Sequence, residues 1–419
     1  MANFLVSNRT CVSWVFRLVP VVPVLLLAAC GGPSTSTNPV SNLTHRAFIS
    51  NMYSGDLQIV DTQNDMTALT QESTNSSGQV VQGQPVAISV STSLSFEVES
   101  PNHATTAVYD PSSDSMWFVT NSGEATSGSV GLGSSTGMAL FSTDSSTLYV
   151  PEPNLCISCT YNGGVQVIDV STNQITATYN VPGAKYIALS PNGTYLFVFS
   201  QNSDSLYLIN LTASTITPVA IPGFARPINA FFSSDSMTAY ILNCGPECGS
   251  SGPASVMEFN IASQAITATV PVGGASVGLL NGTTLYVAGS PVPPGTTSTY
   301  DAVNVSTMTR LTSTSVPIGD GFHTTMALAS NQRLFIGAVT CNNTVTGCLS
   351  VVDVTSNTAE PALPPGGGSI TALLAIANRN VVYAIEGGYL HIYDSTTDML
   401  GSTQITFTGA LYGIVQVDD

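Results

Sequence analysis

The chain of 419 residues is 43% hydrophobic but only 8% charged, and its formal net charge is −17. A surface of this sign repels nucleic acid and anionic lipid headgroups, and no run of basic residues offsets it. We therefore expect no nucleic-acid partner. Few charges combined with many Ser, Thr and Gly favour a β-rich extracytoplasmic protein over a cytosolic enzyme.

The first segment of the chain resembles a bacterial export signal. Two arginines supply positive charge, and residues 19–29 are apolar but too short and too interrupted by proline to span a bilayer comfortably. The segment ends Leu27-Ala28-Ala29-Cys30, which resembles a lipobox. This resemblance implies that residues 1–29 are removed and that Cys30 is lipidated. A plain secretory signal and a membrane anchor are the alternatives.

The rest of the chain divides into a tether and a folded domain. Residues 30–45 are small and polar, which is typical of a flexible tether, and residues 46–419 form the predicted domain. Loss of the two signal arginines would leave a net charge of about −19. We expect the acyl chains on Cys30 to anchor the protein in a membrane of a bacterial cell envelope. The domain would lie at the outer membrane or cell surface and face the periplasm or the exterior.

Residues 184–223 predict one complete unit of four short strands, which we call a, b, c and d in chain order. The turn Ser190-Pro191-Asn192-Gly193 separates strands a and b, because proline presets φ and glycine accepts a positive φ. Strand b, at 195–200, is rich in aromatic and branched residues. Variants of this unit recur along the chain, which argues for one closed repeat architecture instead of several domains.

Eight candidates for strand b set the repeat. They are residues 47–50, 116–120, 147–150, 195–200, 238–242, 284–288, 333–338 and 381–385. After the first two intervals they recur every 43 to 49 residues. Because the first interval is long and the second is short, we interpret the unit around Trp117 as degenerate and place an insertion within residues 71–102.

Seven candidates for strand c share an Asp or Asn after apolar residues, and one is missing between the first two. They end at Asp61, Asp169, Asn210, Asn260, Asn304, Asp353 and Asp394. Such a ladder could be mistaken for a set of metal ligands. We interpret it as a row of turn caps, because Asp and Asn side chains hydrogen-bond the backbone of the turn that follows them.

The two ends of the domain predict how the repeat closes. Candidates for strand a lie near Thr106, Met138, Ile187, Asn229, Val277, Met326, Ala372 and Gly413. The last of these, within 411–417, has no strand b after it, and the strand b at 47–50 has no strand a before it. Their pairing would close a ring and remove exposed sheet edges. We therefore predict an all-β fold, a single β-propeller of four-stranded blades. Eight blades is the direct count, and seven is possible if the Trp117 unit merges with its neighbours.

Three motifs resemble the YVTN-type β-propeller repeat family. The family's turn appears as Ser190-Pro191-Asn192-Gly193, its second strand as Phe118-Val119-Thr120-Asn121, and its third strand as Val167-Ile168-Asp169-Val170. The resemblance covers residues 47–419 and implies a propeller of a secreted or surface protein. Wider relatives include lactonases and quinoprotein-like dehydrogenases, but no residue pattern here transfers those activities.

Six cysteines of the predicted domain fall into close pairs. The pairs are Cys156/Cys159, Cys244/Cys248 and Cys341/Cys348, each in a loop between strands b and c. Even pairing in an exported chain favours three local disulfides, each of which stiffens its own loop. A redox-active Cys-x-x-Cys motif at Cys156 and a shared zinc site are the alternatives. The first lacks a following helix to lower a thiol pKa, and the second lacks the usual paired spacing.

All three predicted disulfides lie on one face of the ring, which we call the b–c face because the b–c and d–a loops emerge there. The long b–c loops fall at residues 151–164, 244–254, 290–300 and 340–347. Stiffened loops on a rigid scaffold are common places for binding sites. The alternative is that these loops are tolerated surface insertions.

Cations are rare enough in this chain to mark a candidate site. Lys185 and Arg226 each precede a strand a, and His323 stands before another, so the topology places all three at the channel mouth on the b–c face. Such a cluster could bind an anionic ligand, with Glu152 and Glu386 as ion-pair partners. The alternative is that these residues form ordinary ion pairs that satisfy the mouth of the channel.

The sequence contains no G-x-S-x-G elbow and no H-E-x-x-H zinc motif, and we assign no catalytic residue, metal ligand or cofactor. The leading hypothesis is a lipid-anchored, non-enzymatic scaffold that binds a protein, a glycan or a small anion through the b–c face. One alternative is a hydrolase or lactonase in the channel mouth, which would bring Glu152, His323 and Arg226 together. Another is a purely structural envelope protein.

Overall fold

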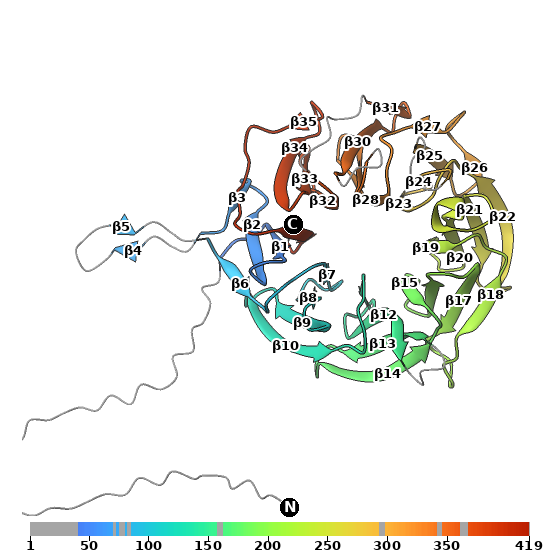
Figure 1. Ribbon diagram of the computed structural model, residues 1–419, viewed down its shortest axis with the longest axis horizontal. Coiled ribbons are helices and arrows are strands. Elements are labelled where there is room, and N and C mark those ends of the chain that lie inside the picture. Colours follow the sequence, from blue (N-terminus) through green and yellow to red (C-terminus); the bar gives the residue numbers. More distant parts are fainter. Residues whose placement is uncertain are drawn as a thin grey trace, which may run out of the picture. The chain divides into compact units, whose positions relative to one another are not determined.

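The computed structural model describes residues 41–69, 73–74, 80–81, 85–156, 162–292, 298–341, 346–360 and 368–418. These residues form eight antiparallel sheets, each four strands wide, that stand around a central axis as the blades of a β-propeller (Figure 1). The predicted all-β propeller with eight blades is confirmed, and the seven-blade alternative is wrong.

Each blade runs from the centre of the ring outward in the order of its strands. Blade 1 holds β36 (Leu411–Gln416), β1 (Arg46–Asn51), β2 (Asp56–Asp61) and an outer strand in two pieces, β3 (Met66–Thr67) and β6 (Ala87–Ser89). Blade 2 holds β7 (Glu97–Glu99), β8 (Thr105–Asp110), β9 (Ser115–Thr120) and β10 (Ala125–Gly131). Blade 3 holds β11 (Leu140–Phe141), β12 (Thr147–Cys156), β13 (Asn162–Asp169) and β14 (Gln174–Asn180). Blade 4 holds β15 (Ala184–Leu189), β16 (Tyr195–Ser200), β17 (Ser205–Asn210) and β18 (Val219–Pro222).

The second half of the ring repeats this arrangement. Blade 5 holds β19 (Pro227–Phe232), β20 (Thr238–Asn243), the 3-10 turn η1 (Gly245–Cys248), β21 (Ser255–Asn260) and β22 (Ala265–Pro271). Blade 6 holds β23 (Val277–Asn281), β24 (Thr284–Gly289), β25 (Thr299–Asn304), β26 (Thr309–Arg310) and β27 (Val316–Pro317). Blade 7 holds β28 (His323–Leu328), β29 (Arg333–Ala338), β30 (Cys348–Asp353) and β31 (Thr358–Ala359). Blade 8 holds β32 (Ile370–Ala375), β33 (Val381–Glu386), β34 (Tyr389–Asp394) and β35 (Met399–Leu400). Outside the blades, β4 (Ser73–Thr74) pairs with β5 (Val80–Val81).

The two ends of the domain meet in blade 1. The last strand, β36, pairs antiparallel with the first strand, β1, so that Phe48 stands opposite Val415 and Ile49 opposite Ile414. The predicted closure by the N- and C-terminal strands is therefore confirmed. It gives β1 a partner on both sides and makes β36 the inner edge strand of that blade.

Apolar clusters join neighbouring blades at all eight interfaces of the ring. Between blades 4 and 5, Phe197 and Phe199 pack with Phe259, and all three are fully buried. Between blades 8 and 1, Ile49 packs with Tyr383. Each such side chain contributes about 1.5–3 kcal/mol when fully buried, so the ring is stabilised mainly by contacts between blades.

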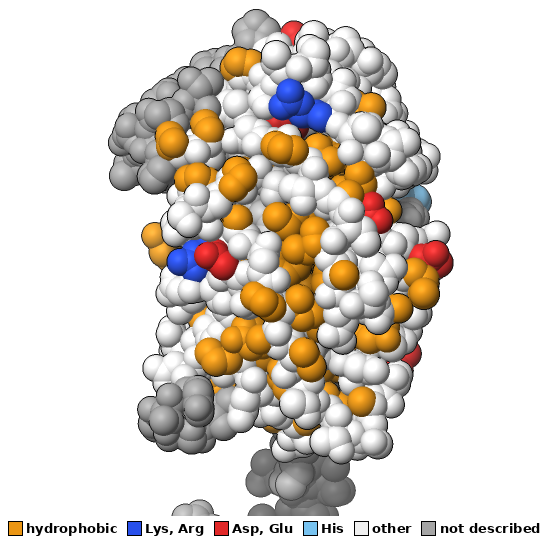
Figure 2. All heavy atoms as spheres, turned by 90° about the vertical axis from the view of Figure 1, so that its right-hand side faces the viewer, with side chains coloured by type: hydrophobic (Ala, Val, Ile, Leu, Met, Phe, Trp, Pro, Cys, Tyr) orange, Lys and Arg blue, Asp and Glu red, His pale blue; other side chains and the backbone are white. Residues whose placement is uncertain are grey.

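The outer wall of the ring reflects the sparse charge of the sequence. Seen from the side of β18 and β22, it shows many apolar side chains and few charged ones (Figure 2). Val219 and Leu311 belong to the exposed apolar residues of the chain, at 45% and 48% exposure.

Blade 2 corrects two sequence assignments. Residues 116–120, expected as a second strand, belong to the third strand β9, and the residues near Thr106, expected as an inner strand, belong to the second strand β8. The inner strand is β7, which is only three residues long and carries two glutamates, so it lacks the apolar run of the other units. The expected insertion within 71–102 falls between β3 and β6, where it interrupts the outer strand of blade 1.

The recurrent Asp and Asn at the ends of the third strands cap the turns that follow, as expected. The side-chain oxygen of Asp169 accepts the amide of Thr172 at 2.8 Å, and that of Asp394 accepts the amide of Thr396 at 2.7 Å. Asp61, Asn210, Asn260, Asn304 and Asp353 make the corresponding bond. These residues therefore shape the c–d turns on the face opposite the b–c face.

The predicted signal segment, Cys30 and most of the predicted tether lie outside the described residues. Within the described part, the end of the tether contacts the propeller, because Ser41 donates hydrogen bonds to Glu124 through its amide and its hydroxyl. No helix in the described part is long and apolar enough to cross a membrane.

A buried arginine stabilises blade 1, where the two ends of the domain pair. Arg46, at the start of β1, is 6% exposed. Its guanidinium donates to Glu124 at 2.8 Å, to the carbonyl oxygen of Asn121 at 2.9 Å and to Asp418 at 3.0 Å. It thereby ties blade 1 to the c–d turn of blade 2 and to the C-terminal segment after β36.

Replacement of this arginine should weaken the whole fold. We expect Arg46→Ala to lower the free energy of unfolding by about 3 kcal/mol, because it leaves the fully buried carboxylate of Glu124 without a counter-charge. Urea unfolding followed by circular dichroism measures the loss. Lys185→Ala, at an exposed position, serves as the control and should stay within about 0.5 kcal/mol of the wild type. Equal stabilities of the two variants would contradict this role of Arg46.

Candidate functional site

Two of the predicted cations line one cavity on the b–c face, which we call the cation pocket. It has a volume of about 190 Å³. Its walls come from the start of β15, the end of β16, the start of β19, η1 and the loop before β28. The lining residues are Lys185, Tyr186, Ser200, Gln201, Arg226, Pro227, Ile228, Glu247, Cys248 and Phe322. Lys185 and Arg226 belong to different blades, so only the ring brings them together.

Most cations of the described residues are held in ion pairs elsewhere. These pairs are Arg46–Glu124 at 2.8 Å, Arg310–Asp301 at 3.7 Å, Arg333–Glu360 at 3.0 Å and Arg379–Asp65 at 2.6 Å. The structure gives Lys185 no ion pair within the described ranges, and its ammonium lies 4.9 Å from the ring centroid of Tyr186. Arg226 Nε lies 3.9 Å from a carboxylate oxygen of Asp204, whose side chain is 51% exposed. The cation pocket therefore holds the two positive charges that carboxylates neutralise least.

The backbone of Arg226 is fixed in an uncommon conformation. Its φ is 52°, in the left-handed region. Its amide donates to Asp204 at 2.9 Å, and its carbonyl oxygen accepts the amide of Cys244 at 3.0 Å. A non-glycine residue in this region costs of order 1–3 kcal/mol and persists where the surroundings hold it. Here the hydrogen bonds to Asp204 and Cys244, in the b–c loops of blades 4 and 5, hold the backbone of Arg226 in this conformation.

Glu247 is a pocket residue that the sequence analysis missed. It lies in η1, and its Oε2 accepts the amide of Ser290 at 2.8 Å, while its buried Oε1 has no hydrogen-bond partner among the residues that the structure describes. Burial raises the pKa of Glu247 to about 7. The only signal in the sequence was an acidic residue between Cys244 and Cys248, and a single glutamate in a loop does not by itself indicate a site.

His323 lies in a second cavity, which we call the histidine pocket. This cavity also has a volume of about 190 Å³. Its lining residues are Tyr186, Ile228, Asn229, Leu242, Ser276, Val277, Gly278, Phe322, His323 and Thr324. Tyr186, Ile228 and Phe322 line both cavities, so the two pockets share a wall. The predicted cluster of three is thus divided between two adjacent pockets.

The two predicted glutamates form hydrogen bonds within or next to their own blades. The carboxylate of Glu152, on blade 3, is fully buried and accepts the amide of Ser134 in the loop before β11. Glu386, on blade 8, is 2% exposed and accepts the hydroxyl of Tyr393 at 3.0 Å. Among the described residues, no ion pair joins either glutamate to the pocket cations. The expectation that they pair with those cations was therefore wrong, because backbone and tyrosine donors within the blade lie closer.

The residues of the enzyme alternative do not converge. Glu152 belongs to blade 3 and His323 to blade 7, which lie on opposite sides of the eight-bladed ring (Figure 1). A general acid and base must lie within hydrogen-bond reach of one reacting group. Among the described residues, Glu152 bonds to Ser134, and no hydrogen bond or ion pair joins it to His323 or Arg226.

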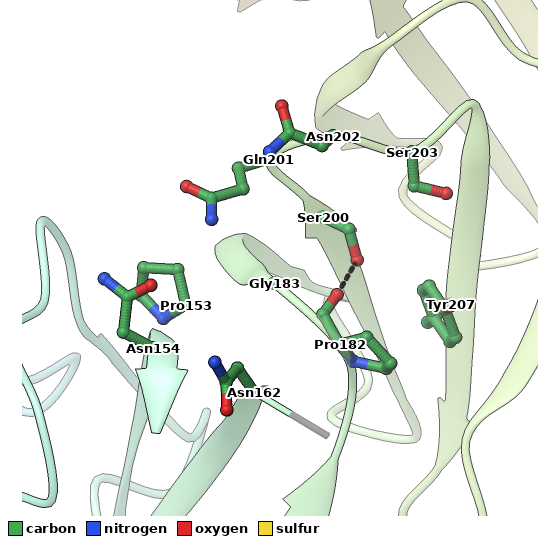
Figure 3. Close-up of a pocket in the computed structure, with 10 residues that line it drawn as sticks. All are labelled: Pro153, Asn154, Asn162, Pro182, Gly183, Ser200, Gln201, Asn202, Ser203 and Tyr207. Carbon is green, nitrogen blue, oxygen red and sulfur yellow. Dashed lines mark hydrogen bonds between the residues drawn. The ribbon is translucent and has the colours of Figure 1, made fainter. Parts of the chain in front are cut away.

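A third cavity continues the cation pocket towards blade 3. It has a volume of about 330 Å³ and shares Ser200 and Gln201 with the cation pocket. Figure 3 shows the amide groups of Asn154, Asn162 and Gln201 around it, with the Ser200 hydroxyl donating to the carbonyl oxygen of Pro182 at 2.5 Å. The described residues that line this cavity are all uncharged, in contrast to the cation pocket.

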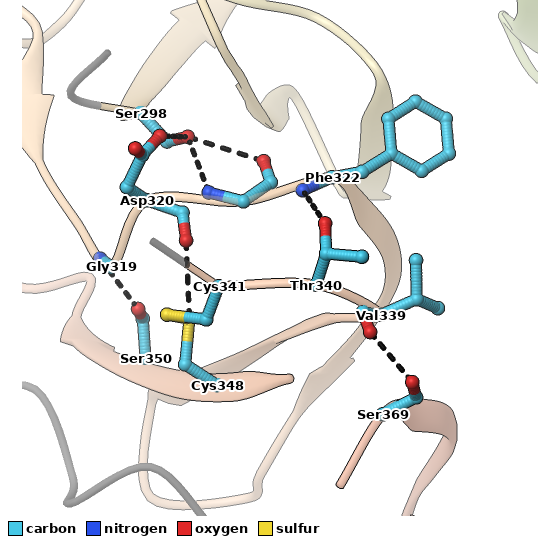
Figure 4. The surroundings of a disulfide bond; sticks show 11 residues. Ser298, Gly319, Asp320, Phe322, Val339, Thr340, Cys341, Cys348, Ser350 and Ser369 are labelled. Atoms are coloured by element: carbon cyan, nitrogen blue, oxygen red, sulfur yellow. Dashed lines mark hydrogen bonds between the residues drawn. A yellow bond between two sulfur atoms is a disulfide. The ribbon is translucent and has the colours of Figure 1, made fainter. Parts of the chain in front are cut away.

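Two described disulfides brace the walls of the cation and histidine pockets. Cys244–Cys248 encloses η1, and Cys248 itself lines the cation pocket. Cys341–Cys348 packs beneath residues 319–322, with Cys348 Sγ at 3.5 Å from the carbonyl oxygen of Asp320 (Figure 4). These two predicted disulfides are confirmed. The third predicted pair includes Cys159, which lies outside the described residues.

The loop of residues 319–322 is held against blade 7 along its length. The amide of Gly319 donates to the hydroxyl of Ser350 at 3.0 Å, and the amide of Phe322 donates to that of Thr340 at 3.4 Å (Figure 4). A Cβ at Gly321 would lie 1.9 Å from the carbonyl oxygen of Thr340, so this close approach requires glycine. The loop therefore presents Phe322 and His323 in fixed positions.

Three buried carboxyl groups should make the stability of the fold fall as the pH rises. Burial raises the pKa of Glu97 to about 8 and those of Glu152 and Glu247 to about 7. Each group keeps its proton in the folded protein at pH values where the unfolded chain has lost it. The stability that they contribute is therefore complete near pH 4 and is lost between about pH 5 and pH 9.

Urea unfolding at pH 5, 7 and 9 measures this loss. In Glu247→Gln the loss should shrink by about 1–3 kcal/mol, because the amide stays neutral throughout the range. A loss as large in the variant as in the wild type would contradict the buried, protonated state of Glu247.

Comparisons with known proteins show similarity in fold. No family model matches the sequence, and no curated protein matches it. The structure is similar to that of dihydro-heme d1 dehydrogenase NirN in complex with DHE, with a TM-score of 0.61 and 12% identity over 93% of this chain and 78% of that chain. Hydrazine synthase of Kuenenia stuttgartiensis gives a TM-score of 0.54 and 15% identity over 74% of this chain and 95% of that chain. A functionally unknown protein from Desulfotomaculum acetoxidans DSM 771 gives a TM-score of 0.52 and 14% identity over 78% of this chain and 96% of that chain. At these identities the likeness is one of fold alone.

Proposed function

We propose that this protein is a lipid-anchored, non-catalytic β-propeller of the bacterial cell envelope that binds a small anionic ligand in the cation pocket. One observation carries the proposal. In a chain of net charge −17, the two cations with the weakest carboxylate partners among the described residues, Lys185 and Arg226, line one cavity. An arginine guanidinium beside an ammonium group suits a carboxylate or a phosphate, because charge-assisted hydrogen bonds to such groups are the strong ones.

The surroundings of the pocket favour binding. The half-buried guanidinium of Arg226, at 20% exposure, interacts with a ligand in a lower effective dielectric than an arginine in bulk solvent. The Cys244–Cys248 disulfide and the left-handed backbone of Arg226 fix the walls beforehand. A preformed site loses less conformational entropy when the ligand binds. The separation of Glu152 from His323 leaves the hydrolase alternative with less support than a binding function.

Membership of the YVTN-type repeat family is part of the same proposal. Its support is the turn Ser190-Pro191-Asn192-Gly193, which connects β15 to β16, and the motif Val167-Ile168-Asp169-Val170, whose first three residues end β13. The copy at Phe118-Val119-Thr120-Asn121 falls on β9, a third strand, although the family motif describes a second strand. Two of the three motifs thus occupy the positions that the family repeat requires.

Loss of the pocket cations should weaken anion binding. We expect the double variant Lys185→Gln/Arg226→Gln to weaken the binding of phosphate or benzoate at least about 30-fold, because two charge-assisted contacts are lost. Isothermal titration calorimetry on the full protein measures both affinities. Arg310→Gln removes a charge from the outer strand β26 of blade 6 and should leave them unchanged. Equal weakening by both variants would point to a diffuse charge effect and contradict a local site.

The lipid anchor has its own test. We expect the wild-type protein, expressed in a bacterium supplied with a clickable palmitate analogue, to incorporate label, since the Leu27-Ala28-Ala29-Cys30 motif resembles a lipobox. Cys30→Ser should incorporate none and should leave the membrane fraction. Equal labelling of wild type and variant would refute lipidation at Cys30.

A further inference from the structure

The third cavity of the b–c face offers polar groups that the proposed anion site does not use. It has a volume of about 330 Å³ (Figure 3). We call it the amide pocket, because four residues with side-chain amides line it, namely Asn154, Asn162, Gln201 and Asn202. The other described residues that line it are uncharged as well. The amide pocket therefore suits neutral polar groups.

The four side-chain amides are accessible and have no partner in the described part of the chain. All four residues are exposed. Among the described residues, none of these side chains donates or accepts a hydrogen bond. Each amide offers two N–H donors and one acceptor oxygen. These groups can therefore bind a ligand in the cavity directly.

The backbone beneath the amide pocket is fixed in advance. The amide of Gly183 donates to the carbonyl oxygen of Asn162 at 2.8 Å, and the carbonyl oxygen of Gly183 accepts the amide of Gln201 at 2.9 Å. Gly183 thus connects the pocket residues of blade 3 with those of blade 4. A Cβ at Gly163 would lie 2.2 Å from the amide nitrogen of Gly183, so this close approach requires glycine. A preformed pocket loses less conformational entropy when a ligand binds.

The chemistry of the pocket walls matches a sugar ring. A side-chain amide presents a donor and an acceptor side by side, and two neighbouring hydroxyl groups can each donate and accept. Several amides around one cavity therefore suit a polyhydroxyl ring. The half-buried ring of Tyr207 and the rings of Pro153 and Pro182 add apolar surface. The C–H groups of a sugar ring can pack on the Tyr207 ring, because the face of an aromatic ring is electron-rich.

The same walls suit a peptide less well. A peptide that adds to a sheet uses the unpaired backbone groups of an edge strand. The strands that supply pocket residues are β12, β13, β16 and β17, and each has a partner strand on both sides. The pocket therefore offers side-chain amides in place of a free strand edge, which favours a saccharide.

The amide pocket adjoins the cation pocket, since Ser200 and Gln201 line both cavities. A ligand that lies along these two residues can place its neutral part among the amides and its charge beside Lys185 and Arg226. Small-ligand sites have volumes of about 300–1,000 Å³. The amide pocket, at about 330 Å³, lies at the lower end of this range and so suits a single sugar ring better than a long oligosaccharide.

We propose that the ligand is an anionic saccharide, a sugar ring that carries one carboxylate or phosphate group. Its anionic group binds Lys185 and Arg226 in the cation pocket. Its hydroxyl groups form hydrogen bonds with the side-chain amides of Asn154, Asn162 and Gln201. This inference rests on the proposed function, since it assigns the ligand class of the same site. It adds a second pocket that selects ligands by their hydroxyl groups.

The test compares anions with and without a sugar ring. Glucuronate and galacturonate are compared with cyclohexanecarboxylate, which has a six-membered ring and a carboxylate but no hydroxyl group. Glucose 6-phosphate is compared with inorganic phosphate. We expect the wild-type full protein, in isothermal titration calorimetry, to bind at least one saccharide about tenfold more tightly than its counterpart, because two hydrogen bonds between neutral groups contribute about that factor. The comparison that shows the preference identifies the anionic group.

Removal of two amides should remove this preference. In the double variant Asn154→Ala/Asn162→Ala, we expect the affinity for the preferred saccharide to fall about tenfold, while the affinity for its counterpart is kept. Both side chains are exposed, so the variant should unfold at the same temperature as the wild type. Gln174→Ala removes an exposed amide from the outer strand β14 of the same blade and should change neither affinity.

The outcomes separate this inference from the proposed function. If phosphate or benzoate binds through Lys185 and Arg226 but no saccharide is preferred over its counterpart, the ligand class is refuted and the anion site stands. A preference that persists in Asn154→Ala/Asn162→Ala also refutes the ligand class. So does tighter binding of N-acetylaspartate, which represents an acidic peptide, than of every saccharide. If none of these anions binds, or Lys185→Gln/Arg226→Gln binds them equally well, the proposed function itself fails.

Discussion

The antiparallel pairing of β1 with β36 is the contact on which the rest of the structure depends. Blade 1 takes its inner strand from one end of the domain and its other strands from the other end, so it forms only when the two ends meet. The apolar clusters on both sides of this blade then complete the series of eight. The ion pairs of Arg46 with Glu124 and Asp418 stabilise the same blade. Without closure, the loops of blades 4, 5 and 7 would have no fixed relation to one another.

Charge is distributed unevenly over the two faces of this acidic protein. Many of its carboxylates cap turns on the c–d face, where backbone amides and hydroxyl groups satisfy them. Several arginines sit in ion pairs that join strands or blades. On the b–c face, burial keeps Glu152 and Glu247 partly protonated near neutral pH. Lys185 and Arg226 therefore dominate the local potential of one pocket, although the chain as a whole is strongly negative.

Disulfides and hydrogen bonds in the loops make the b–c face rigid, in addition to the packing of the blades. One disulfide encloses η1 and the other supports residues 319–322. Hydrogen bonds from blade 7 and a glycine without space for a Cβ hold the second of these segments. Short covalent loops stabilise a fold less than long ones do, so these bonds act chiefly on the geometry of the pockets. His323, which follows this segment and is fully buried, is thereby held in a fixed position.

The sequence by itself determined the repeat, the closure, the turn caps and the face on which Lys185, Arg226 and His323 lie, because these follow from local periodicity, turn chemistry and chain order. It misplaced two strands of blade 2, because β7 is short and charged and so carries no apolar periodicity. Only the tertiary structure decided that His323 lies in a pocket of its own, that Glu247 joins the cations, and that Glu152 and Glu386 bond within their blades. Those outcomes depend on which side chains meet across neighbouring blades and on how deeply each is buried. Strand patterns along one chain contain no information on either.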